Sequence, residues 1–137
     1  MKTLKMVFLM VILSLFVNGV VFAMVNVKGS WEGEIRIPPA DYATDITVKI
    51  TTQNCDMFSG TVRSDSLGIS GKISGKIFSI MNQQSIIDFR ITITSPCSGA
   101  FTGKAILNQT GTRIGFLLNN GTGCMAGNNN GRGYLQK

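Results

Sequence analysis

Residues 87–94, Ile-Asp-Phe-Arg-Ile-Thr-Ile-Thr, alternate apolar and polar side chains without a break. Successive side chains of a strand point to opposite faces, so this period of two predicts a β-strand with one buried face. The alternation recurs along the chain and predicts strands at 31–37, 46–51, 58–63, 69–73, 76–81, 87–94, 101–107, 113–118 and 131–136. No ten-residue window has a helical period, so the sequence predicts an all-β fold.

Clusters of Pro, Gly, Asn and Ser separate these strands and predict turns. The clusters lie at 38–39, 53–54, 64–66, 74–75, 82–84, 95–96, 108–111 and 119–121. Links of hairpin length favour antiparallel strands that pair in chain order. Because closure leaves no unpaired edge, we expect a small up-and-down meander barrel of about eight strands.

The face opposite the apolar one carries a charged side chain in nearly every predicted strand. A charge that faces lipid at the middle of a membrane costs about 2–4 kcal/mol. We therefore expect a soluble barrel with its apolar face turned inward, not a barrel of the outer membrane.

The first residues have the pattern of a secretory signal peptide. Lys2 and Lys5 precede an apolar run, and small residues end the segment at Ala23. Asn18-Gly19 interrupts the run before the roughly 20 apolar residues that a membrane-spanning helix needs. We predict cleavage after Ala23, with 24–137 forming one secreted or periplasmic domain that lacks a transmembrane segment; an uncleaved anchor is the alternative.

Charge is unevenly distributed along the 137 residues. Removing residues 1–23 lowers the formal net charge from +6 to +4, and all seven acidic residues lie between Glu32 and Asp88. A basic C-terminal third predicts attraction to an anionic envelope component; the alternative is that single charges spread over the strands serve solubility. The aromatic residues share the inward register, so the sequence does not favour nucleic-acid binding.

The composition argues against catalysis. The chain has no histidine, the one unperturbed side chain that titrates near neutral pH. A reactive cysteine usually has a cation beside it that stabilises the thiolate, but the neighbour of Cys55 is the acidic Asp56. The three cysteines also lack the C-x-x-C spacing of zinc sites. The glycine-rich run 121–127 leads into Asn128-Asn129-Asn130 and not into a helix, so it predicts a rim loop. We expect no enzyme, no metal site and no cofactor.

Three cysteines in an exported chain predict one disulfide and one remaining thiol. Counting the predicted strands places Cys55, Cys97 and Cys124 after the second, sixth and eighth, hence all at one rim. A Cys97–Cys124 bridge is the first choice and Cys55–Cys97 the second. Closing 97–124 contributes about 3 kcal/mol in the chain-entropy model.

Four glycines, Gly33, Gly60, Gly71 and Gly103, fall on the inward register of strands. Glycine inside a strand marks a bend or a close approach of backbone, which suits a small barrel with a filled core. The alternative is that the missing side chains leave a ligand pocket, because eight-stranded barrels are either just filled or hold one small ligand. The candidate lumen residues are Trp31, Phe58, Phe89, Phe101 and Phe116.

Gly29-Ser30-Trp31-Glu32-Gly33 resembles the Gly-x-Trp opening strand of lipocalin-like and avidin-like barrels, and Phe58-Ser59-Gly60-Thr61-Val62 resembles an avidin-like strand. The Ile-Ser-Gly-Lys repeat at 69–76 is similar to the same glycine-punctuated meander. The resemblance implies the barrel fold for the whole exported domain. It argues against biotin, because avidin-like sites typically place Asn where Gly33 stands and stack the ligand among several Trp.

These observations lead to two functional hypotheses. The first is a non-enzymatic exported barrel that binds a small apolar or amphipathic ligand in its lumen or at its rim. The second is an interaction or structural protein with a filled core that binds a macromolecule through its rim loops. The sequences at Asn108 and Asn120 also match the glycosylation sequon, which matters only in a eukaryotic secretory pathway.

Overall fold

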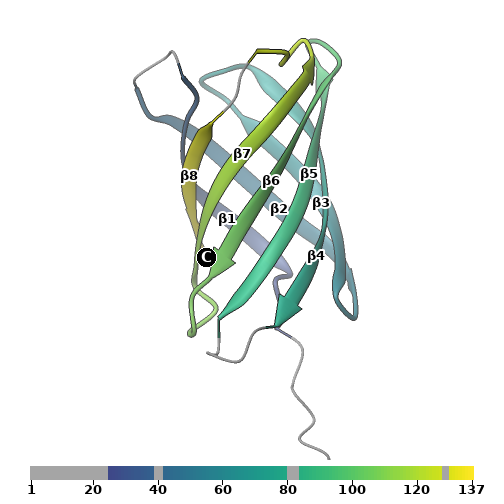
Figure 1. The fold of residues 1–137 in the computed structure, drawn as a ribbon, viewed down its shortest axis with the longest axis vertical. Coiled ribbons are helices and arrows are strands. Elements are labelled where there is room, and N and C mark those ends of the chain that lie inside the picture. The colour runs from purple at the N-terminus through teal and green to yellow at the C-terminus, as the bar shows by residue number, and fades with distance from the viewer. Residues whose placement is uncertain (1–24, 39–41, 80–83, 128–129) are drawn as a thin grey trace, which may run out of the picture.

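The computed structural model describes residues 25–38, 42–79, 84–127 and 130–137. They form one closed antiparallel barrel in which every strand pairs with its neighbours in chain order and β1 pairs with β8 (Figure 1). The strands are β1 (Gly29–Arg36), β2 (Thr44–Asn54), β3 (Met57–Ser64), β4 (Ile69–Ser79), β5 (Ser85–Ser95), β6 (Gly99–Leu107), β7 (Arg113–Gly123) and β8 (Gly131–Gln136). The predicted fold class is confirmed, and the predicted signal peptide lies outside the described residues.

The alternation that predicted the strands is the alternation of burial. In β5, Ile87, Phe89, Ile91 and Ile93 are buried, and the residues between them face outward. Inward side chains of all eight strands merge into a single hydrophobic core, and no buried side-chain polar atom of the described residues lacks a hydrogen-bond partner. In the part of the chain that the structure describes, no helix is long and apolar enough to cross a membrane.

Two predicted turns are wrong. Ser74-Gly75 lies inside β4, where Gly75 pairs with Phe58 on one side and Phe89 on the other, so 69–73 and 76–81 belong to one strand. The turn predicted at 119–121 lies inside β7, which continues to Gly123. At 74–75, pairing with strands on both sides outweighs the local turn preference of Ser and Gly. At 119–121 the register with β6 shifts and Asn120 has a φ of 51°, so the local preference produces an irregularity within β7 and not a turn. The barrel therefore has eight strands, one fewer than the predicted segments.

The inward glycines are points of close backbone approach. A methyl group built on any of the four would collide with a carbonyl oxygen of the adjacent strand, which at Gly103 belongs to Leu117. Phenylalanine rings cover three glycines on neighbouring strands: Phe58 covers Gly75, Phe89 covers Gly103 and Phe116 covers Gly133. Such ring-over-glycine pairs let a strand bend while its gap is filled. This geometry supports the filled-core interpretation of the glycines.

Candidate functional site

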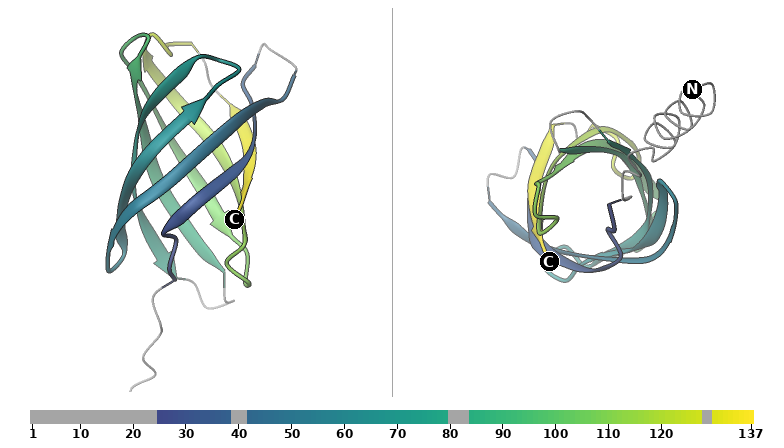
Figure 2. Two further views of the ribbon diagram at one scale, coloured as in Figure 1. Left: turned by 180° about the vertical axis from the view of Figure 1, so that it is seen from behind. Right: turned by 90° about the horizontal axis from the view of Figure 1, so that it is seen from below.

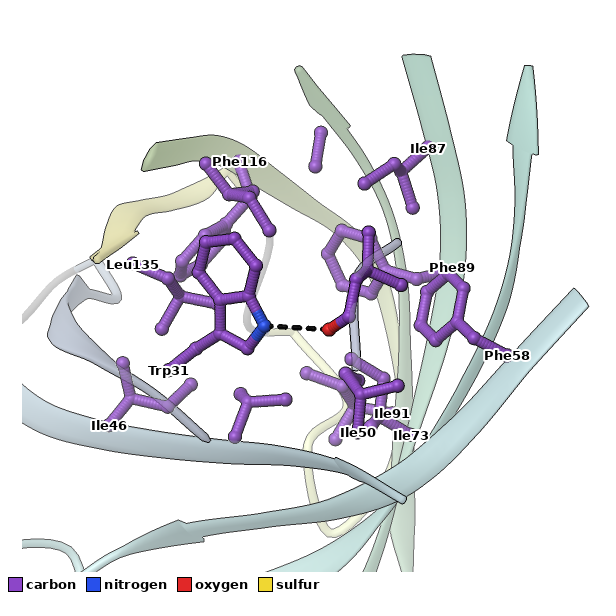
Figure 3. A pocket seen from close by; sticks show the side chains of 14 residues that line it. Trp31, Ile46, Ile50, Phe58, Ile73, Ile87, Phe89, Ile91, Phe116 and Leu135 are labelled. Carbon is purple, nitrogen blue, oxygen red and sulfur yellow. Dashed lines mark hydrogen bonds between the residues drawn. The ribbon is translucent and has the colours of Figure 1, made fainter. Parts of the chain in front are cut away.

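The five predicted lumen residues all lie inside the barrel. Four of them, Trp31, Phe58, Phe89 and Phe116, line one apolar cavity (Figure 3). Phe101 lines a separate, smaller hollow. Phe89 and Phe116 meet edge to face with their ring centroids 6.2 Å apart. The other lining residues are Val27, Ile46, Val48, Ile50, Ile73, Ile87, Ile91, Ala105, Ile114 and Leu135.

The cavity measures about 40 Å³. An apolar cavity that takes up a ring the size of benzene is about 150 Å³, so this one does not accommodate a ligand of several heavy atoms. The second internal hollow, which Phe101 lines, is about 20 Å³. The interior in this conformation is filled by its own side chains.

The segment before β1 closes one end of the lumen. Val27 is buried, and its carbonyl accepts a 2.9 Å hydrogen bond from Nε1 of Trp31, whose side chain has no exposed surface. Gln53 holds the segment from β2: its Oε1 accepts from the Val27 amide at 2.9 Å, and its Nε2 donates to the Val25 carbonyl at 2.7 Å. Seen along the barrel, this segment lies within the ring of strands (Figure 2). We call Val25–Val27 the plug.

The opposite end carries the disulfide. Cys97, between β5 and β6, is bonded to Cys124, just after β7, as predicted. Cys55 is exposed and unbonded in the link between β2 and β3. Three strands separate Cys55 from Cys97, so these residues lie at opposite ends of an up-and-down barrel. The prediction that all three cysteines share a rim is wrong, because it counted β4 as two strands, and the alternative Cys55–Cys97 bridge is excluded.

Asp45 fastens a turn at the disulfide end. Its two carboxylate oxygens accept 2.9 Å hydrogen bonds from the backbone amides of Asp65 and Ser66, in the link between β3 and β4. Hydrogen bonding by the Ser66 side chain, and then by these two amides, lowers the pKa of Asp45 to about 2. The carboxylate therefore stays charged far into the acidic range.

The outer surface of β5, β6, β7, β8 and β1 carries two adjacent rows of unusual composition. In the first row, Lys104 pairs with Leu117, Leu117 with Arg132, and Arg132 with Arg36. The second row lies two residues along, about 6.6 Å away. It contains Ile86, Ile106, Gly115 and Tyr134 as successive cross-strand partners. Closure of the barrel brings residues from both ends of the chain onto this face.

Large apolar side chains are exposed on this face. Ile106 is 51% exposed and Leu117 is 56% exposed. Gly115 between them faces open space, and the hollow in front of it measures about 640 Å³. Ile86, Ile106 and Leu117 line the hollow together with Lys104 and Arg113. We call Ile86, Ile106, Leu117 and Tyr134 the apolar strip.

Cations flank the strip, and two carboxylates lie next to it: Glu34 is the cross-strand partner of Tyr134, and Asp88 that of Lys104. Of the cations Arg36, Lys104, Arg113 and Arg132, only Lys104 forms an ion pair with a described carboxylate, that of Asp88 at 3.1 Å. The guanidinium of Arg113 lies 4.9 Å from the ring centroid of Tyr134, a cation–π contact that leaves its hydrogen bonds free. The sequence showed the excess of positive charge, but it did not show that these residues and the apolar strip share one face.

The two asparagines of the glycosylation sequons, Asn108 and Asn120, differ in their surroundings. Asn108 uses its side chain within the β6–β7 link, where Nδ2 donates to Thr110 and Thr112 and Oδ1 accepts from the Thr112 and Arg113 amides. Asn120 is exposed within β7. Across the residues that the structure describes, no three His, Cys, Asp or Glu side chains cluster as metal ligands would.

Comparison with known proteins adds evidence on the fold alone. No protein-family model matches the chain, and no curated protein does. The barrel is similar to a solved structure described as a redesigned beta barrel, b11L5F_LGL. The TM-score is 0.58 at 15% sequence identity, and the match covers 81% of this chain and 90% of that chain.

Proposed function

We propose that this protein is an exported, non-enzymatic barrel with a filled core that binds an anionic component of the cell envelope through its outer surface. The observation that carries the proposal is the Arg36–Arg132 pair. These two exposed arginines are direct cross-strand neighbours on β1 and β8. Neither forms an ion pair with any carboxylate among the described residues, although Glu34 lies two residues from Arg36 on β1.

Like charges placed directly opposite each other destabilise a sheet. An anion that accepts hydrogen bonds from both guanidinium groups would remove this repulsion, since Arg presents a fork of donors suited to phosphate, sulfate and carboxylate oxygens. Residues 89–137 contain five cations and no acidic residue, which extends the positive surface beyond the pair. The binding surface in this proposal lies on the strands β6–β8 and β1 and not in the rim loops.

The proposal includes the finer resemblance to avidin-like and lipocalin-like barrels. Its support is the position of Trp31 near the start of β1 and the meander order of all eight strands. Biotin is not among the proposed ligands, because Gly33 stands where avidin-like sites place Asn and the chain has a single tryptophan.

The test is binding to two soluble polyanions, a sulfated polysaccharide and a long-chain polyphosphate, measured by titration calorimetry at several salt concentrations. The variant Arg36→Gln with Arg132→Gln should weaken binding about ten-fold or more, because one charge-assisted hydrogen bond contributes about 1.5 kcal/mol. Lys49→Gln with Lys72→Gln is the matched control: it removes two exposed cations that flank Thr61 on the other side of the barrel. Equal losses in both variants, or no binding by the unaltered protein, would overturn the proposal.

A second candidate function is binding of a small apolar ligand in the lumen after the plug moves. The observation in its favour is the apolar cavity of about 40 Å³ that contacts both Val27 and Trp31. Displacing Val27 would enlarge that space at one end. A naphthylamine dye that fluoresces in apolar surroundings tests this candidate, since uptake should rise when Val27→Ala enlarges the cavity and should not rise with the exposed control Asn26→Ala.

A further inference from the structure

We propose that the apolar strip and the cations around it dock the barrel side-on against a lipid surface that carries acidic headgroups. This inference rests on the proposed function and names its anionic component. The strip lies on the outer face of β5–β8, where exposed aliphatic side chains of two adjacent rows stand beside Lys104 and Arg132.

The geometry fits the boundary between acyl chains and headgroups. Ile106 is the cross-strand partner of Gly115, and Leu117 lies two residues from Gly115 on β7. Both exposed side chains line the same hollow, so both can enter the lipid together. Arg132 is the cross-strand partner of Leu117, and Arg113 lies two residues from Gly115 on the other side. Cations therefore flank the aliphatic pair on both sides, at the level where lipid phosphates lie when those side chains are inserted.

The positive charges beside the strip favour a lipid surface with acidic headgroups as the binding partner. The three aliphatic side chains and the half-buried tyrosine of the strip, with the 42% exposed Phe78 opposite Ile86, bury too little apolar area for tight binding to a neutral bilayer. Binding of this kind grows with electrostatic attraction to acidic lipids. Each Lys or Arg near such a surface strengthens binding about five-fold. An acidic protein partner would also satisfy the cations, but the open hollow at Gly115 suits flexible acyl chains.

The experiment uses protein recovered after export from its own host, with its N-terminus established by mass spectrometry, so that all variants share the same start. Co-sedimentation is measured with vesicles of phosphatidylcholine alone and of phosphatidylcholine with phosphatidylglycerol. We expect binding to the acidic vesicles only. Ile106→Ser with Leu117→Ser should weaken it about ten-fold with no change in net charge, and Arg113→Gln with Arg132→Gln about 25-fold with a flatter salt dependence.

The control for lost apolar surface is Tyr42→Ser, which removes a side chain that is 61% exposed in the link between β1 and β2 and should change binding less than two-fold. Thermal unfolding of each variant verifies that the barrel is intact. If polyanion binding persists but acidic vesicles do not bind, or bind independently of Ile106 and Leu117, the lipid inference is overturned while the proposed function stands. If neither polyanions nor vesicles bind, both are overturned.

Discussion

The inside of the barrel and its apolar strip differ in how completely their apolar side chains are buried and their polar groups are paired. Inside, Phe rings cover glycines and the only tryptophan has both its ring buried and its N–H hydrogen-bonded. On the strip, the side chains of Ile106 and Leu117 are half exposed, and beside it Arg36 faces Arg132. The first region lowers the free energy of the folded state, and the second raises it.

This difference supports the proposal that the protein binds its partner through the outer surface and not in the lumen. A small barrel gains stability from a filled interior, so the close packing of the lumen needs no ligand to explain it. Exposed aliphatic side chains and facing like charges give the isolated barrel no comparable advantage. Substitutions inside should therefore change stability, and substitutions on the strip should change binding.

The largest expected effect is that of Trp31→Ala. Removing a fully buried indole should lower the free energy of unfolding by about 3–5 kcal/mol, measured by urea denaturation followed with circular dichroism. Trp31→Phe retains much of the packing and loses mainly the hydrogen bond to Val27, so it should cost less. Near-normal stability of Trp31→Ala would contradict a filled interior.

The disulfide comes next. Cys97→Ser with Cys124→Ser should lower the unfolding free energy by about 3 kcal/mol, because the bond closes a loop across a sequence separation of 27. Cys55→Ser is the control and should leave stability within about 0.5 kcal/mol of the unaltered protein, since this thiol is exposed and unbonded. Peptide mapping that found Cys55 in the bridge would refute the strand count.

The sequence predicted the inside of the barrel better than its surface. Period-two alternation located the buried residues, and the Cys97–Cys124 pairing survived the miscounted strand because two whole strands still separate these cysteines. The plug was missed because three residues are too few to show a period; its signal was the Val-x-Val pattern directly before β1. The strip was missed because its members become neighbours only through the registers of β5–β8. The Arg36–Arg132 pair was missed because only closure makes β1 a neighbour of β8.

Gln53→Leu should loosen the plug. It removes the side-chain groups that bond Val25 and Val27, and we expect a loss of about 1–2 kcal/mol. Hydrogen exchange should show the Val27 amide opening faster than amides in the middle of β5. The exposed residue Gln136 provides the control, Gln136→Leu, with unchanged exchange at Val27. Equal protection of Val27 in both variants would mean that packing alone holds the plug.

The smallest effect concerns pH. Folding lowers the pKa of Asp45 to about 2, from near 3.9 in the unfolded chain. The ionised carboxylate therefore contributes its full stabilisation of the fold at pH values above the unfolded pKa. That stabilisation is lost as the pH falls toward 2. Melting temperatures of Asp45→Asn and the unaltered protein should therefore differ at pH 6 and converge near pH 2. A constant difference across this range would contradict the assigned hydrogen bonds.

The most direct test of a filled interior with an external binding surface uses Trp31, the single tryptophan and hence a reporter of the lumen. Protein is titrated with acidic vesicles whose acyl chains carry bromine, while co-sedimentation records the bound fraction. We predict that the protein binds while the wavelength and intensity of Trp31 emission stay constant, because the indole has no exposed surface and lines the internal cavity. Quenching or a red shift on binding would place lipid in the lumen and contradict this account.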